Sequence, residues 1–278
     1  MKKISRRSFM AAAAVSVAAL ALTACGGSAS SAASSVASSA ASSEAVSSAA
    51  AAELTTVEAG KLTMATNATF PPYEMTTDSG EIEGIDVDTA KAIAEKLGLE
   101  LQIDDMDFDA ALLSVQQGKA DIVMAGVTVT DERKAVMDFS DSYATGIQSI
   151  IVPEGSDIAS PDDLAGKKIG TQRGTTGYIY CSDDFGDDAV VAYDNGLTAV
   201  QALNNGQVDA VVIDNAPAKE YVAANPGLAI LDTSYAEEDY AIGMAKGSSL
   251  EAAVNAALEE LKADGTLQAI VDKYIKAE

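Results

Sequence analysis

The chain has 278 residues, 48% of them hydrophobic and 22% charged, which is enough for one or two globular domains that each bury a core. Its 42 acidic and 18 basic residues give a net charge of −24, and so acidic a chain excludes nucleic acid as an expected partner. The sequence contains no histidine. Because histidine is the commonest general base and zinc ligand, most hydrolytic triads and zinc sites are excluded as well.

The N-terminus has the organisation of an export signal. Residues 1–7 carry four positive charges, and residues 10–24 form an uncharged, alanine-rich run that is too short to span a membrane. The run ends at Leu22-Thr23-Ala24-Cys25-Gly26, which is similar to the lipobox of bacterial lipoproteins. This resemblance implies a signal peptide at 1–24 and an acylated, palmitate-bearing Cys25 that anchors the protein to the extracytoplasmic face of the cell membrane. An ordinary cleaved signal with an incidental cysteine is the alternative.

Residues 5–10 resemble a twin-arginine motif, so the general and the twin-arginine export routes both stay open.

The segment that follows Cys25 has the composition of a flexible tether. From Gly26 to about Ala52 the chain is almost wholly Ser, Ala and Gly, which cannot bury enough apolar surface to offset the entropy of ordering. We therefore expect residues 25–59 to be disordered. The remaining cysteine, Cys181, has no histidine to activate it, and we interpret it as a small, half-buried residue on a helix rather than a reactive thiol.

From about Gly60 onward, strands and helices are predicted to alternate. Apolar periodicity and glycine stops give, in chain order, strand 62–66, helix 86–97, strand 99–103, helix 108–117, strand 120–125, strand 168–171, strand 209–213 and a helix that starts near Ala216. Such alternation indicates an α/β fold with mainly parallel sheets. The acidic run 104–109 lacks the glycine and glutamate that an EF-hand needs at positions six and twelve, so no metal or other cofactor is expected.

Two segments of the chain are similar to each other. Residues 114–123 and 202–211 each contain the end of a helix, a glycine, a polar residue, an aspartate and an apolar strand. A coincidence between two α/β units is one explanation, and two lobes built on one plan is the other. Because ligands of such sheets bind beyond the carboxyl ends of the strands, the site is expected between the lobes, near Ala125-Gly126 and Asp214-Asn215.

Several motifs in this order resemble the family 3 bacterial extracellular solute-binding proteins over residues 60–278. They are Gly84-Ile85-Asp86-Val87-Asp88, the segment 125–133 running into Asp138-Phe139-Ser140, Gly174-Thr175-Thr176-Gly177, and the segment 261–274. The resemblance implies a two-lobe type II periplasmic-binding-protein fold with a two-strand hinge. Lobe 1 would contain 60–147 and 243–278, and lobe 2 would contain 152–238, with crossings near 147–152 and 240–243.

The same resemblance implies a function and a set of partners. The protein would be a monomer and not an enzyme, and it would capture an amino acid for the permease of an ABC importer. Two rival functions use the same scaffold. A dehydratase would need a tuned acid in the cleft, for which Glu74 is the nearest candidate, and a sensory domain would need signalling segments that do not follow in this sequence.

The resemblance assigns the ligand's carboxylate to residues from both lobes. Arg133 would bind it through two parallel hydrogen bonds, and Thr128 and the backbone of Gly126 would complete the cradle. Thr175 and Thr176 open a helix whose free N–H groups would hold the same carboxylate from lobe 2. The alternatives are a surface arginine in a charged helix and threonines that only cap a helix.

The other ligand groups are assigned in the same way. Asp214 would bind the α-ammonium group, unless it is only a solvated cap of the next helix. Phe70 and Phe108 would enclose the ligand's side chain, and Asn67 would face its end. Relatives that prefer cationic ligands tend to have an acid in place of Asn67, and relatives that bind glutamine tend to have Lys and His in place of Gln172 and Ile213. We therefore predict a neutral polar or sulfur-containing amino acid such as cystine or glutamine, although Arg173 could favour an acidic side chain.

Overall fold

The computed structural model describes residues 54–275, so the predicted signal peptide, the predicted acylation site Cys25 and most of the predicted tether lie outside the described residues. The first sheet has the strand order β5-β1-β6-β14-β7. Its strands are β1 (Lys61–Thr66), β5 (Glu100–Asp105), β6 (Ile122–Val123), β7 (Met137–Phe139) and β14 (Gly243–Ala245). β5, β1 and β6 are parallel, whereas β14 and β7 are antiparallel to their neighbours.

The second sheet has the order β10-β9-β11-β8-β12, with β13 paired to β8. Its strands are β8 (Ala144–Pro153), β9 (Ile169–Gln172), β10 (Val190–Tyr193), β11 (Ala210–Asp214), β12 (Leu228–Ile230) and β13 (Ala236–Tyr240). As in the first sheet, three strands (β10, β9 and β11) are parallel, and antiparallel strands follow. The predicted α/β architecture is confirmed, and the antiparallel strands are those that connect or flank the two sheets.

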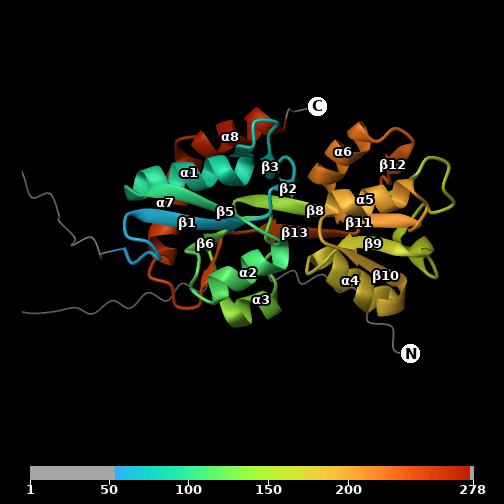
Figure 1. Ribbon diagram of the computed structural model, residues 1–278, viewed down its shortest axis with the longest axis horizontal. Coiled ribbons are helices and arrows are strands. Elements are labelled where there is room, and N and C mark those ends of the chain that lie inside the picture. Colours follow the sequence, from blue (N-terminus) through green and yellow to red (C-terminus); the bar gives the residue numbers. More distant parts are fainter. Residues whose placement is uncertain (1–53, 276–278) are drawn as a thin grey trace, which may run out of the picture. The chain divides into compact units, whose positions relative to one another are not determined.

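Helices cover both faces of each sheet, and a small antiparallel sheet lies beside the first (Figure 1). The helices are α1 (Ile85–Leu97), α2 (Phe108–Gln116), α3 (Asp131–Val136), α4 (Thr176–Phe185), α5 (Gly196–Asn204), α6 (Asn215–Ala224), α7 (Glu251–Ala263) and α8 (Thr266–Tyr274), with short 3-10 turns η1 (Pro161–Leu164) and η2 (Asp187–Ala189). The small sheet comprises β2 (Thr69–Phe70), β3 (Glu74–Thr76) and β4 (Ile82–Glu83). Phe70 of β2 and Glu74 of β3 belong to this small sheet and line the cavity described below.

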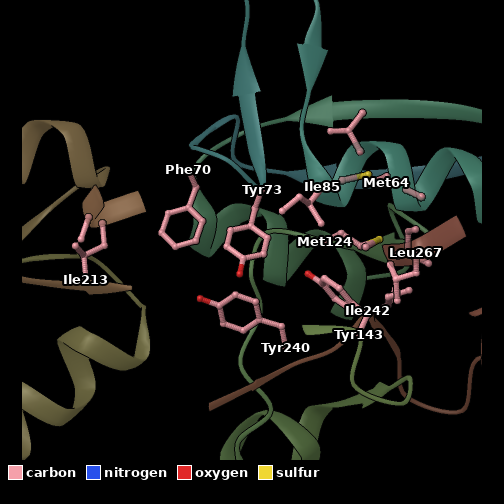
Figure 2. Close-up of a cluster of buried hydrophobic side chains, with 14 of the residues drawn as sticks. Met64, Phe70, Tyr73, Ile85, Met124, Tyr143, Ile213, Tyr240, Ile242 and Leu267 are labelled. Carbon is pink, nitrogen blue, oxygen red and sulfur yellow. The ribbon is translucent and has the colours of Figure 1, made fainter. Parts of the chain in front are cut away.

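The strands alternate between two apolar layers, as period-two side-chain geometry requires. In the second sheet, Ile150 and Val212 pack with the layer under α4, and their neighbours Ile151 and Val211 pack with the layer under α5 and α6. Figure 2 shows part of the cluster to which Ile151 and Val211 belong, in which Met64 and Met124 lie with Ile85 and Leu267. Because each central strand is buried on both faces, its sequence is a nearly continuous apolar run.

The internal similarity corresponds to a repeated local structure. Gly118 and Gly206 have φ angles of 66° and 67°, the left-handed conformation that glycine adopts without steric cost. The amide of Gly118 donates to Val115 O at 2.9 Å, and that of Gly206 donates to Leu203 O at 3.0 Å. The two halves therefore end these helices in the same way.

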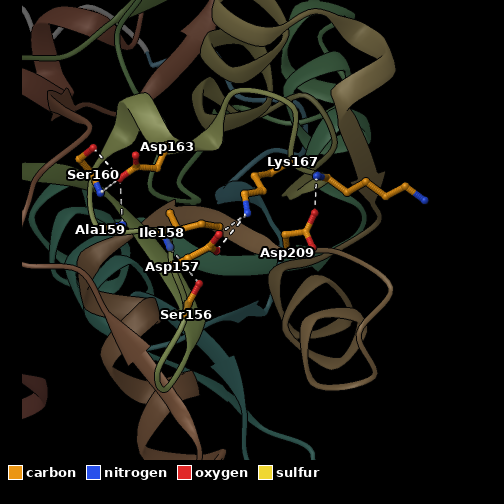
Figure 3. Close-up of polar contacts among 9 residues, drawn as sticks. Ser156, Asp157, Ile158, Ala159, Ser160, Asp163, Lys167 and Asp209 are labelled. Carbon is orange, nitrogen blue, oxygen red and sulfur yellow. Dashed lines mark hydrogen bonds and ion pairs between the residues drawn. The ribbon is translucent and has the colours of Figure 1, made fainter.

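The aspartate of each repeat then ties the turn to the sheet. The Asp121 carboxylate accepts from the amide of Thr63 at 2.8 Å, and the Asp209 carboxylate accepts from the amide of Lys168 at 2.8 Å (Figure 3). The backbone amides of the same aspartates donate back to the carbonyls of Thr63 and Lys168. This reciprocal pair in both halves supports the two-lobe reading over coincidence.

The chain passes between the sheets earlier than expected at the first of two predicted crossings, 147–152 and 240–243. β7 of the first sheet ends at Phe139 and β8 of the second begins at Ala144. β13 of the second sheet ends at Tyr240 and β14 of the first begins at Gly243, which coincides with the second predicted crossing. Ile150 to Val152 instead pair with β11 and β12 inside the second sheet. Apolar composition alone does not mark where the strand enters the sheet, because Ile147 is as apolar as Ile150, yet it is exposed whereas 148–152 are all buried.

The turn between the small sheet and α1 provides a test of the fold. Gly84 has a φ of 141°, and a Cβ there would lie 2.1 Å from the carbonyl oxygen of Tyr73. Gly84→Ala should therefore lower the free energy of unfolding by more than about 3 kcal/mol, the range of strongly disruptive substitutions. Urea unfolding measures this effect. The control is Gly80→Ala, which also has a positive φ (85°) but open space around it, and an equal loss in both variants would contradict the close approach.

Candidate functional site

A narrow cavity lies where the carboxyl ends of β1 and β6 face those of β9 and β11. It has about 310 Å³ of empty space in all, but a water-sized molecule can occupy only about 20 Å³ of it. All nine residues predicted to bind the ligand line it: Asn67, Phe70, Phe108, Gly126, Thr128, Arg133, Thr175, Thr176 and Asp214. Three further lining residues were not among them: Glu74, Ala125 and Gln172.

Contacts between the two halves surround this cavity. Gln172 Nε2 donates to Asn67 Oδ1 at 3.0 Å, and the Arg133 guanidinium donates to the carbonyl of Gly174 at 3.1 Å. The hydroxyl of Tyr221 also donates to the carbonyl of Thr69. The residues of the first sheet are thus in direct contact with those of the second around the cavity.

Arg133 is a buried cation rather than a surface arginine. Thr130 caps α3 by accepting from the Arg133 amide, and only 8% of Arg133 is exposed. Its guanidinium donates to the carbonyl of Thr128 at 2.7 Å and lies over the Phe108 ring, 5.4 Å from the ring centroid. Within residues 54–275 no carboxylate oxygen lies within 4.0 Å of it. Burial lowers the pKa of Arg133, since it disfavours the charged form.

Gly126 allows the end of β6 to approach an aromatic ring. Its φ is 55°, and a Cβ would lie 2.9 Å from Cε1 of Phe70. The Gly126 amide donates to Asp86 Oδ2 at 2.9 Å, and the hydroxyl of Tyr143 donates to the same oxygen at 2.8 Å. Asp86 therefore holds the strand end in place from the start of α1, and burial raises its pKa to about 6.

The N-terminus of α4 combines capping with free donors. The Thr175 hydroxyl accepts from the amide of Tyr178, so this residue does cap the helix. Thr176 is the first helical residue, and its amide is one of the N–H groups that a helix leaves without an internal partner. Capping by Thr175 and anion binding by the N–H groups are therefore compatible.

Asp214 does not cap α6 with its side chain. It stands at the N-cap position, yet its carboxylate accepts no hydrogen bond from the helix. Oδ2 accepts from Gln148 Nε2 at 2.8 Å, Oδ1 has no protein partner among the described residues, and the residue is 7% exposed. Burial, with the nearby Glu238 carboxylate as a further cause, raises the pKa of Asp214 to about 7. The alternative of a solvated helix cap is not realised.

Aromatic and amide side chains form the rest of the wall. Phe70 and Phe108 are both buried, and Phe70 stacks on Tyr73 with the ring centroids 6.0 Å apart (Figure 2). Asn67 donates to the carbonyl of Met106 at 2.9 Å, in addition to accepting from Gln172. These contacts fix the Asn67 amide in one orientation.

Glu74 is a cavity residue that the sequence reading considered only as the acid of a rival enzyme. It is fully buried, and neither carboxylate oxygen has a hydrogen-bond donor among the described residues. Burial, followed by repulsion from Asp86, raises its pKa well above the ordinary value. Glu74 could have been predicted as a site residue because it directly follows the segment Phe70-Pro71-Pro72-Tyr73, and Phe70 was already assigned to the site.

Glu238 and Gln148 were missed because they lie on the connecting strands. Both are buried, and their side chains hydrogen-bond to each other. The signal in β13 was its alternation, since Glu238 shares the inward face with the buried Tyr240 while Asp239 is exposed. A charged residue on the inward face of a strand is a sign of a special role.

Cys181 lies deeper in the structure than its sequence context predicts. Cys181 is fully rather than half buried on α4, and burial raises the pKa of its thiol to about 12, which makes it unreactive. Among residues 54–275 no group of three or more Cys, Asp or Glu side chains is arranged to hold a metal ion. Within the same range no helix has the length and apolar character of a membrane span.

A two-lobed fold whose halves enclose a cavity lined by buried, oppositely charged groups defines a solute-binding protein of the type II periplasmic class. The chain belongs to the bacterial extracellular solute-binding proteins, family 3, whose family model matches residues 62–277. Members of this family that resemble the chain are substrate-binding components of amino-acid transport and are not catalytic.

Individual relatives bind different amino acids. The chain is 34% identical to the L-cystine-binding protein TcyJ of Escherichia coli strain K12 over 226 residues, which cover 80% of this chain and 85% of TcyJ. The arginine-, lysine-, histidine-binding protein ArtJ from Geobacillus stearothermophilus has a TM-score of 0.75 and 36% identity, covering 78% of this chain and 96% of ArtJ. An ancestral arginine-binding protein bound to glutamine has a TM-score of 0.75 and 44% identity, covering 78% and 99%.

Proposed function

We propose that this chain captures a free amino acid in the cavity between its two sheets and delivers it to the permease of an ABC importer. The observation that carries the proposal is the pair of buried, opposite charges in one cavity. Arg133 has no carboxylate partner among the described residues, and one oxygen of Asp214 has no donor. A buried charge is costly unless it is paired, and the zwitterionic end of an amino acid supplies both missing partners.

The carboxylate end of the ligand is assigned to Arg133 and backbone N–H groups. A guanidinium has five N–H donors. Two nitrogens of Arg133 each donate one hydrogen bond to a backbone carbonyl, which leaves further N–H groups for a ligand. The amide of Thr128 makes no hydrogen bond within the described residues. Together with the first amides of α4, it provides neutral donors of the kind that hold an anion without a full countercharge.

The ammonium end is assigned to Asp214. Its carboxylate ends a buried apolar strand, and the cavity removes it from bulk water. An ammonium group that pairs with it would favour the ionised form and so lower a pKa that burial has raised. Because Arg133 and Asp214 line the same small cavity, a ligand must carry both charges within a few bonds, as an α-amino acid does.

For the side chain we propose a neutral polar or sulfur-containing group, enclosed by Phe70 and Phe108. The polar groups at that end are the amides of Asn67 and Gln172, which carry no charge and are paired with each other. The cystine-binding relative and the ancestral protein bound to glutamine support this class.

A cationic side chain is the second candidate, and Glu74 is the observation that favours it. This buried carboxyl group lines the cavity and accepts no hydrogen bond from the described residues. A guanidinium or ammonium group of the ligand would pair with it in its ionised form. The arginine-, lysine-, histidine-binding ArtJ supports this candidate.

We further propose that Cys25 carries a lipid anchor after removal of residues 1–24, and that the protein is a monomer that does not catalyse a reaction. The proposed lobes are 60–147 plus 243–278 and 152–238. Support for the lobes comes from the repeated helix-strand turns at Gly118 and Gly206. A ligand recovered unchanged after incubation would separate binding from dehydratase chemistry.

Calorimetry with arginine, lysine, glutamate, glutamine and cystine tests the ligand class. We expect the tightest binding for glutamine or cystine, and Glu74→Gln should change that affinity by less than about threefold, because no ligand charge pairs with Glu74. The control is the exposed Glu81→Gln on the neighbouring hairpin turn. Tightest binding of arginine, together with a loss above about tenfold in Glu74→Gln alone, would overturn the neutral class and assign the cationic one.

Arg133→Met tests the carboxylate site. The substitution removes the only buried cation that lines the cavity within the described residues, so binding of whichever panel amino acid binds tightest should weaken by more than about 30-fold. Circular dichroism should show an unchanged fold. Lys134→Met, an exposed neighbour on the same helix, is the charge-matched control, and equal affinities in the two variants would show that Arg133 does not contact the ligand.

A further inference from the structure

Three hydrogen-bond donors converge on a single oxygen of Glu238. Its Oε2 accepts from the hydroxyl of Thr176 at 2.9 Å, from Gln148 Nε2 at 3.0 Å and from the hydroxyl of Thr128 at 3.1 Å. Glu238 is only 7% exposed. All three donors use the same oxygen, whereas Oε1 has no hydrogen-bond partner among the described residues.

The threonine hydroxyls cannot donate to a ligand at the same time. A hydroxyl has one proton and two lone pairs, whereas an ionised carboxylate only accepts. Thr128 and Thr176 therefore both direct their proton to Glu238, and the two hydroxyl oxygens lie 3.5 Å apart. Both residues line the cavity. The Thr176 oxygen accepts from Gln148 Nε2 at 3.4 Å, which leaves it one lone pair. What the two side chains can offer to a ligand is therefore an acceptor. A carboxylate is the wrong partner for that arrangement, and an ammonium group is the right one.

Glu238 is also linked to the proposed ammonium site. Gln148 Nε2 donates to Asp214 Oδ2 at 2.8 Å and to Glu238 Oε2 at 3.0 Å, so one amide joins both carboxylates. The negative charge of Glu238 contributes to the raised pKa of Asp214. Asp214 and the two threonines line the cavity, and Glu238, which does not line it, contacts both hydroxyls. A positive group beside Asp214 and these hydroxyls would relieve the repulsion between the two carboxylates.

We propose that Glu238 is a positioning residue that selects the ligand's α-ammonium group: it orients the hydroxyls of Thr128 and Thr176 as acceptors and, with Asp214, makes this end of the cavity negative. The proposal rests on the amino-acid function proposed above and differs from the expectation that the Thr128 hydroxyl holds the carboxylate. Arg133 and backbone amides then hold the carboxylate alone.

A purely structural role for Glu238 makes a different prediction. Thr128 follows the first sheet and Thr176 begins α4 of the second half, so Glu238 could simply hold the two halves together. In that case, removing the Glu238 carboxylate would weaken the binding of every ligand by the same factor. Selection of the ammonium group instead requires an effect that depends on the substituent at the ligand's α-carbon.

The experiment compares amino acids with their 2-hydroxy acid counterparts, which keep the carboxylate and lack the ammonium group. L-arginine, L-glutamine and L-cystine and their hydroxy acids are titrated by calorimetry into wild-type protein and into Glu238→Gln, which keeps the shape and loses the charge. We expect the wild-type preference for the amino acid to fall at least about tenfold in Glu238→Gln, with hydroxy acid affinity changed by less than about threefold.

Matched variants make the outcome decisive. Glu237→Gln is the same change at the exposed preceding residue and should leave the preference unchanged. Thr176→Val removes one acceptor and one of the three donors to Glu238 but keeps the Glu238 charge, and it should lower the preference in the same direction. Equal weakening of both ligand types, or an unchanged preference, would overturn the role of Glu238 while leaving amino-acid binding intact. Failure of all three amino acids to bind wild-type protein would overturn the proposed function and this inference with it.

Discussion

The rest of the site depends on two buried charges that the chain itself does not neutralise. Arg133 is held by carbonyl oxygens and an aromatic ring, and Asp214 by one amide, so each is oriented without being paired. Burying both costs free energy that the folded chain recovers only when a ligand of complementary charge is present. This constraint makes binding and closure one process, because the charges come from opposite halves of the molecule.

The repeated architecture explains why these groups meet. Each half ends a helix at a left-handed glycine and starts a buried strand with an aspartate that ties the turn to its neighbour. Parallel strands built this way end at the same edge of their sheet, and two such edges face each other across the connecting strands. Gly126 and Asp214 follow or end those strands, so the fold itself places a closely approaching backbone and a carboxylate at the cavity.

The sequence allowed the parallel centre of both sheets and the cavity's main residues to be predicted, because strand ends and glycine stops are local signals. Arg133 could be placed only through its motif, since a charged helix is equally typical of a surface. Glu74 and Glu238 were not predicted. Their character comes from burial by segments distant in sequence, as when Thr176 and Gln148 meet the Glu238 carboxylate. The entry point of β8 into the second sheet was misplaced for the same reason, since pairing partners rather than composition decide it.

Closure on the ligand is the central claim, and small-angle X-ray scattering from residues 54–278 tests it most directly. Without a ligand, the uncompensated charges of Arg133 and Asp214 should favour separation of the two halves, and a bound amino acid should shift the population to the closed form. The radius of gyration should therefore decrease when the tightest-binding amino acid is added to saturation. A scattering profile that does not change at saturation would contradict the account.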